Sequence, residues 1–320
     1  MLKILAGVLA LLLLLAVAAW VRYRGPDIPF ETLDQQYADA HSHFIDLPGG
    51  VRVHYRDEGK PDGPALVLLH GYGDSFTSWE GWVAALGDRY RLISLDFPGH
   101  GLTRAPAGYR LDADALVDVV ESVAARLQLD SFALAGNSMG GGVAWRYAIH
   151  VAGRTPAHLK ALILLDAAGF PPEGPPKAVP LAFRLLRYPL GRKLLASIDN
   201  TPFIQEGLKV DVADPSVITP ALVARWAKFQ RAPGHRDILM SVDISSQLAA
   251  TTEGLSHISV PTLVVHGEVD PLIELASSRR MAAAIPGARL LVYPRVGHLP
   301  QIEIPQRSAA DVAEFLASLE

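Results

Sequence analysis

The stretch that decides the fold reads Phe132-Ala-Leu-Ala-Gly-Asn-Ser-Met-Gly-Gly141 and continues as Gly142-Val-Ala-Trp-Arg-Tyr-Ala148. It begins with a short apolar run typical of a buried strand, and the part after it reads as a helix. Between the two stands the pattern G-x-S-x-G. A serine on such a strand-to-helix turn projects above the carboxyl end of its strand. The stretch therefore predicts a nucleophile, Ser138, at the head of a helix whose dipole favours developing negative charge.

Other apolar runs of strand length recur on both sides of this stretch. They are Val51–Arg56, Ala65–His70, Arg91–Asp96, Ala161–Leu165, Thr262–Val265 and Arg289–Tyr293. Helix-like segments lie between them, such as Ala113–Leu127, where apolar residues recur near the helical period. Strands that alternate with helices predict an α/β fold with a mostly parallel, doubly wound sheet.

The segment from about 171 to 255 breaks this alternation. It has no strand-like run, and it consists of proline-containing turns and short amphipathic stretches. A structureless loop of that length is uncommon in a compact domain. The segment therefore predicts a helical cap inserted between two strands, with ordinary crossover helices packed on the sheet as the alternative.

A serine hydroxyl needs a base that a third group holds in place. His298 follows the last apolar run, and Asp270 follows the run before it. The chain order Ser138, Asp270, His298 is the order that this kind of sheet imposes on a catalytic triad. Asp166 also ends an apolar run and is the competing acid, whereas His266 is expected to pack locally.

Two backbone amides are predicted to stabilise an oxyanion. The turn His70-Gly-Tyr-Gly73 follows a buried run and can direct the N–H of Tyr72 to the point above the sheet where Ser138 lies. The N–H of Met139 is the second predicted donor. The side chain of His70 is expected to hydrogen-bond its own loop, and His100 is expected to be structural.

The first residues differ in kind from the rest. Residues 4–21 contain no charge, and Lys3, Arg22 and Arg24 flank them. A run of about 18 apolar residues is just long enough to cross a hydrocarbon core. Residues 1–24 are therefore expected to be a retained membrane anchor, which places the enzyme at the bacterial inner membrane with its catalytic domain extracytoplasmic. The small residues Ala16-Val-Ala18 leave open a cleaved signal and a secreted protein.

After this anchor, residues 25–50 are expected to form a linker and residues 51–320 the catalytic domain with its cap. The chain has 320 residues, 50% of them hydrophobic, with a net charge of -4 and no cysteine. This balance argues against nucleic-acid binding, and the lack of cysteine excludes disulfides and thiolate metal sites. No metal or organic cofactor is predicted, and the sequence does not indicate an oligomeric state.

Five motifs together resemble the α/β-hydrolase family over about residues 45–320. They are HGYG from His70, DFPGHG from Asp96, GNSMGG from Gly136, HGEVD ending at Asp270 and GHLPQIEIP from Gly297. The resemblance implies the roles given above for Ser138, Asp270, His298, Tyr72 and Met139. It also separates the chain from haloalkane dehalogenases and epoxide hydrolases, which need an aspartate in place of the serine.

The resemblance favours bacterial membrane-associated esterases and lipases, and hence a small-molecule ester with an apolar acyl group as substrate. The GNSMGG motif is also similar to that of carbon–carbon bond hydrolases of ring-cleavage products, but those usually carry tryptophan where Leu299 follows the histidine. Cofactor-free perhydrolases share the triad. A membrane-tethered binding protein on an inactive scaffold is the non-enzyme alternative.

Overall fold

The computed structural model describes residues 2–154, 158–171, 188–241 and 247–319. One eight-stranded sheet has the order β1-β2-β4-β3-β5-β6-β7-β8. Its strands are β1 (Ser42–Leu47), β2 (Val51–Gly59), β3 (Ala65–Leu69), β4 (Arg91–Leu95), β5 (Phe132–Asn137), β6 (Leu159–Leu165), β7 (Thr262–Gly267) and β8 (Arg289–Tyr293). Only the pairings β1–β2 and β2–β4 are antiparallel. The predicted fold class, an α/β-hydrolase fold with a mostly parallel sheet, is confirmed.

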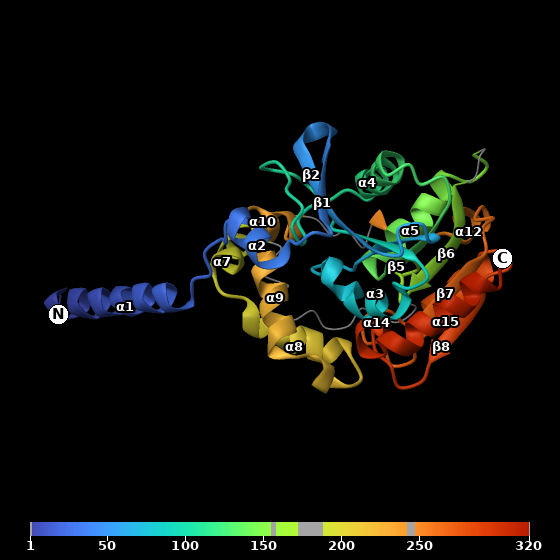
Figure 1. Cartoon of the computed structure of the whole chain (residues 1–320). Coiled ribbons are helices and arrows are strands. Elements are labelled where there is room, and N and C mark those ends of the chain that lie inside the picture. Colours follow the sequence, from blue (N-terminus) through green and yellow to red (C-terminus); the bar gives the residue numbers. More distant parts are fainter. Residues whose placement is uncertain (1, 155–157, 172–187, 242–246, 320) are drawn as a thin grey trace.

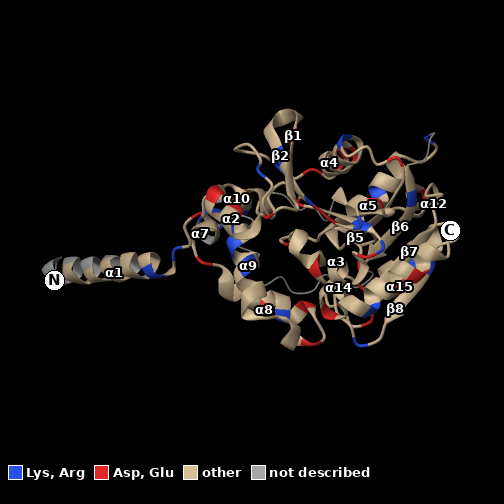
Figure 2. Cartoon of the chain, in the orientation of Figure 1, with Lys and Arg blue, Asp and Glu red and all other residues tan. Residues whose placement is uncertain are grey.

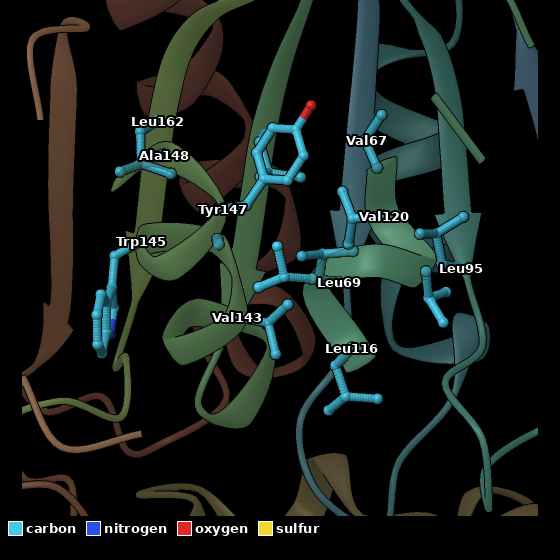
Figure 3. Close-up of a cluster of buried hydrophobic side chains, with 14 of the residues drawn as sticks. Val67, Leu69, Leu95, Leu116, Val120, Val143, Trp145, Tyr147, Ala148 and Leu162 are labelled. Carbon is cyan, nitrogen blue, oxygen red and sulfur yellow. The ribbon is translucent and has the colours of Figure 1, made fainter. Parts of the chain in front are cut away.

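Helices cover both faces of the sheet, which explains why the central strands are apolar throughout. Along β3, Val67 and Leu69 belong to one core cluster, and Leu66 and Leu68 belong to the other. The first cluster includes α4 (Ala113–Arg126), α5 (Met139–His150) and α13 (Leu275–Ala284), and the second includes α3 (Glu80–Leu86) and α15 (Pro305–Ala317). Figure 3 shows side chains of the first cluster between these helices and the strands.

The prediction of a linker over residues 25–50 is wrong. This segment contains α2 (Phe30–Tyr37), the edge strand β1 and a short 3-10 turn, η1 (Pro48–Gly50). Leu33 is fully buried in a small cluster with Phe76 and Phe229. The sequence pattern of β1 is weak because an edge strand is half exposed, and only Ile45 of its six residues is buried.

The described residues between β6 and β7 contain helices and no strand, as expected of a cap. They form α7 (Pro189–Ser197), α8 (Thr201–Asp211), η3 (Pro215–Val217), α9 (Pro220–Gln230), α10 (His235–Leu239) and α12 (Thr252–Ser256). Leu255 of α12 packs in the first core cluster, so this helix belongs to the body of the domain. The predicted cap also includes residues 172–187 and 242–246, which lie outside the described residues. The remaining short helices are η2 (Phe76–Trp79) and α14 (Pro300–Glu303).

The helix α1 (Leu2–Tyr23) projects away from the rest of the protein (Figure 1). Leu11, Leu14 and Leu15 each expose more than half of their surface. Arg22 in the last turn of α1 places a positive charge near the end that joins the domain (Figure 2). Within the described residues, no helix combines the length and the apolarity needed to cross a membrane.

Candidate active site

Ser138 lies on the sharp turn between β5 and α5, and its backbone is in a region that non-glycine residues rarely adopt. Its φ and ψ are 54° and -116°. Such strain persists only where the surroundings enforce it. A Cβ on Gly140 would lie 2.3 Å from the main-chain oxygen of Leu69, so only glycine lets the turn approach β3 this closely. The partly exposed serine therefore stands at the carboxyl end of the central strands.

His298 and Asp270 form a hydrogen-bonded pair in loops at the same sheet edge. Nδ1 of His298 lies 2.7 Å from Oδ2 of Asp270. Oδ1 of Asp270 accepts the N–H groups of Leu272 at 2.7 Å and Ile273 at 3.0 Å. Burial alone would raise the pKa of Asp270, but the hydrogen bond and charge of His298 and these loop amides lower it. An ionised Asp270 fixes the tautomer in which Nδ1 of His298 carries the proton and Nε2 is the basic nitrogen.

Hydrogen bonds to main-chain atoms of His298 hold its loop next to the turn of Ser138. Nδ2 of Asn137 donates to the main-chain oxygens of His298 at 3.0 Å and of Leu165 at 3.2 Å. The N–H of His298 donates to the main-chain oxygen of Asp211 at 2.6 Å. His298 is thus held by the residue before Ser138 on one side and by the end of α8 on the other.

The two predicted amide donors belong to segments next to Ser138. A Cβ on Gly71 would lie 3.3 Å from Cβ of Ser138, so the turn after β3 touches the serine. Tyr72 follows in this turn, and its hydroxyl donates to the main-chain oxygen of Leu239 on α10. Met139 is the first residue of α5, and an N–H at this position has no acceptor within its own helix. Both amides lie in segments that can face an oxyanion, and their role stays a prediction.

The other histidines of the sequence motifs have local partners. Nε2 of His70 accepts the N–H of Phe97 at 3.1 Å, so its proton is on Nδ1, which donates to the main-chain oxygen of Gly71 at 2.7 Å. Burial lowers the pKa of His70 and stabilises this neutral form. Nδ1 of His100 lies 3.0 Å from the main-chain oxygen of Pro98. These rings shape the loops around the site.

Asp166 ends β6 beside the pair but is not the carboxyl group that Nδ1 of His298 contacts. It is fully buried, and its Oδ1 accepts the N–H of Gly267 at 2.9 Å. One potential ligand atom from each of Asp166, Asp270 and His298 lies within 4.8 Å of the others. This spacing would suit a cation, but Oδ2 of Asp270 is engaged by the imidazole.

Sequence reasoning missed Asp211, the last residue of α8. It is half-buried, and its charge interacts with His298 and Asp270. Burial raises its pKa to about 6; the charge of His298 opposes this shift and that of Asp270 adds to it. No motif surrounds Asp211, so its only signal was a carboxyl group at the end of a cap helix.

The fold and the placement of these residues define a hydrolase. Residues 64–305 match the family described as alpha/beta hydrolase fold, and the chain belongs to this family.

Three similar proteins are named as two kinds of hydrolase. A 2-hydroxymuconate semialdehyde hydrolase from Pseudomonas sp. (strain CF600) is 30% identical over 86% of this chain and 93% of its own. A crystal structure of a meta-cleavage product hydrolase variant superposes with a TM-score of 0.73 at 26% identity, over 86% of this chain and 98% of its own. A crystal structure of a membrane phospholipase A has a TM-score of 0.72 at 25% identity and covers 98% of both chains.

Proposed function

We propose that this protein is a serine hydrolase that cleaves neutral carboxylic esters with an apolar acyl group through an acyl-enzyme. Nε2 of His298 removes the proton of Ser138 as the serine oxygen attacks the ester carbonyl carbon. The amides of Tyr72 and Met139 stabilise the tetrahedral oxyanion. The imidazolium, held by Asp270, then gives its proton to the leaving alcohol. A water molecule activated by the same histidine releases the acid and restores the serine.

The observation that carries this proposal is the position of Asp211. Its carboxyl group interacts electrostatically with His298 and Asp270, and with a pKa of about 6 it is mostly ionised at neutral pH. A second negative charge beside the catalytic pair disfavours anionic substrates, because like charges repel more strongly where water is excluded. A neutral ester bond in an uncharged molecule suits this site.

Carbon–carbon bond hydrolysis is the second candidate, and the sequence relatives favour it. The substrate named for the Pseudomonas enzyme is a muconate derivative and therefore carries a carboxylate. A ketone carbonyl can be attacked by the same serine, so the triad does not separate the two reactions. The charge of Asp211 supports the ester reaction, because it would oppose binding of such an anion.

A substrate panel tests the choice between the two reactions. We expect p-nitrophenyl esters of increasing acyl length to be hydrolysed with higher kcat/KM than a vinylogous diketone ring-cleavage product. The Ser138→Ala variant, prepared in parallel, gives the background for both. Turnover of the diketone that exceeds turnover of every ester would replace ester hydrolysis with carbon–carbon hydrolysis.

We also propose that α1 associates the enzyme with a membrane, at the bacterial inner membrane with the catalytic domain extracytoplasmic. Two observations support this. Most of the described side chains of α1 are large, apolar and exposed, which is rare on the surface of a soluble monomer. The membrane phospholipase A matches 98% of this chain, which leaves too few residues for the 22-residue α1 to lie outside the match.

A further inference from the structure

The buried carboxyl group of Asp166 has an oxygen that lacks a donor. Oδ1 accepts the N–H of Gly267 at 2.9 Å and lies 3.2 Å from Nδ1 of His266. Oδ2 has less than 1 Å² of exposed surface and receives no hydrogen bond from the described residues. A buried carboxylate oxygen without a donor is costly, whereas a protonated oxygen is itself a donor.

The acceptor for that proton is the neighbouring carboxyl group. Asp166 and Asp270 have carboxyl oxygens within 4.8 Å of each other. Two carboxyl groups this close in a buried site do not both ionise. The pair therefore retains one proton.

The donors around each group decide where the proton resides. Asp270 accepts two loop N–H groups and the imidazole of His298, which together stabilise its negative charge. Asp166 accepts one main-chain N–H. His266 shares its Nδ1 between Asp166 and the hydroxyl of Ser278, which lies closer at 2.8 Å. The charge thus remains on Asp270 and the proton on Asp166.

We propose that Asp166 is a positioning residue: a neutral carboxylic acid that donates a hydrogen bond to Asp270 and so fixes the carboxylate that orients His298. Burial and the negative charges of Asp270 and Glu303 all raise the pKa of Asp166, and the amide of Gly267 opposes them. The order His298, Asp270, Asp166 is then a hydrogen-bonded chain of three side chains. This role in turnover rests on the proposed serine hydrolase function.

The charged and titratable groups around Asp166 come from β7, β8, α14 and the loops that follow the two strands. They are His266 of β7, Asp270 after β7, His298 after β8, Tyr293 of β8 and Glu303 of α14. Only His298 among them is expected to gain charge during turnover. A hydrogen bond from Asp166 makes Asp270 a weaker acceptor for the imidazole. Loss of the donor at 166 therefore lets Asp270 stabilise the charged form of His298 more strongly. The acidic limb of the pH profile of kcat/KM then moves to higher pH.

A spectroscopic measurement tests the proton without any substrate. In the infrared difference spectrum of the resting wild-type enzyme minus Asp166→Asn at about pH 8, we expect the C=O band of a protonated carboxylic acid. If this C=O band is absent and carboxylate bands appear in its place, Asp166 is ionised and the proposal is wrong. Because no turnover is involved, this result is independent of whether esters are the substrates.

Kinetics test the positioning role. Asn at 166 keeps a neutral donor, so kcat should stay within about threefold of wild type and the acidic limb should not move. Ala at 166 removes the donor, and kcat should fall about tenfold with little change in KM, with the limb displaced to higher pH. Melting curves of both variants identify loss of folded protein. A loss in folded Asp166→Asn as severe as that in Asp270→Asn would show that Asp166 is an ionised acid and refute the proposal.

Discussion

Nδ2 of Asn137 donates to the main-chain oxygen of His298 at 3.0 Å, across 161 positions of sequence. One side chain therefore joins the turn that carries Ser138 to the loop that carries His298. The same group also donates to the main-chain oxygen of Leu165 at 3.2 Å.

Asn137→Ala should lower kcat about 10- to 100-fold. Two buried carbonyl oxygens lose their donor, and the imidazole of His298 is no longer held in line with Ser138. Steady-state kinetics on one ester measure the loss. Asn200→Ala is the matched control, since Nδ2 of Asn200 bonds Gln230 in the cap. Equal effects of the two substitutions would contradict the assignment.

Substitutions at Ser138, Asp270 and His298 should reduce kcat far more than substitution of a histidine elsewhere in the protein. Ser138→Ala and His298→Ala should each reduce kcat on the order of 10³-fold or more, and Asp270→Asn by 10²- to 10⁴-fold, because the amide favours the wrong imidazole tautomer. His158, whose Nδ1 faces the main-chain oxygen of Asp130, is the control histidine. Labelling by a fluorophosphonate reports Ser138 directly, and a folded chain that takes no label would be the inactive binding protein.

Asp211 should make the choice between neutral and anionic substrates depend on pH. With a pKa of about 6, it loses its charge as the pH falls through that value. The ratio of kcat/KM for an anionic ester to that for its neutral analogue should therefore rise below about pH 6 in wild type. Taking the ratio cancels pH effects that are common to the two substrates. In Asp211→Asn the ratio should be higher at neutral pH and flat; a ratio that still varies would exclude Asp211 as its cause.

Membrane association should depend on α1. The full chain should sediment with membranes, and a variant that lacks residues 2–24 should be released and keep its activity on short-chain esters. The retained part starts at Gly25, whose N–H donates to the main-chain oxygen of Ser197 and which precedes α2 and β1. Recovery of the full chain in the supernatant of washed membranes would refute the proposal.

Asp74 should make stability fall with rising pH. Burial raises its pKa from 3.8 to about 7, against the hydrogen bonds from Ser78 and Ser75. The unfolded chain therefore loses this proton first, and the free energy of unfolding declines as the pH rises from about 4 to about 7. Asp74→Asn should remove this decline, as measured by urea unfolding at several pH values. A variant that declines as steeply as wild type would assign the slope to other groups.

The parts of the molecule that the sequence predicted well are those with a strong local pattern. The strand Ala65–Leu69 is buried on both faces and is therefore a continuous apolar run. Ser138, Asp270 and His298 each follow such a run, and parallel strands bring their carboxyl ends to one edge. The strand Ser42–Leu47 was missed because its half-exposed residues show no clean alternation.

Contacts between residues that are far apart in the sequence could not be predicted from it. Asp166 and Asp270 both end strands, and only the structure assigns the imidazole to Asp270. The approach of α8 to the histidine loop, which brings Asp211 to the site, has no periodicity or motif that could predict it.

The order of these residues along the chain also governs when chemistry becomes possible during protein synthesis. Ser138 and its turn leave the ribosome well before the loop after β8, which carries the base. At about 5–20 residues per second, the 160 positions from Ser138 to His298 take on the order of ten seconds to translate. Throughout that interval the nascent polypeptide has Ser138 without His298, so the proposed attack on an ester cannot begin before the loop after β8 has been synthesised.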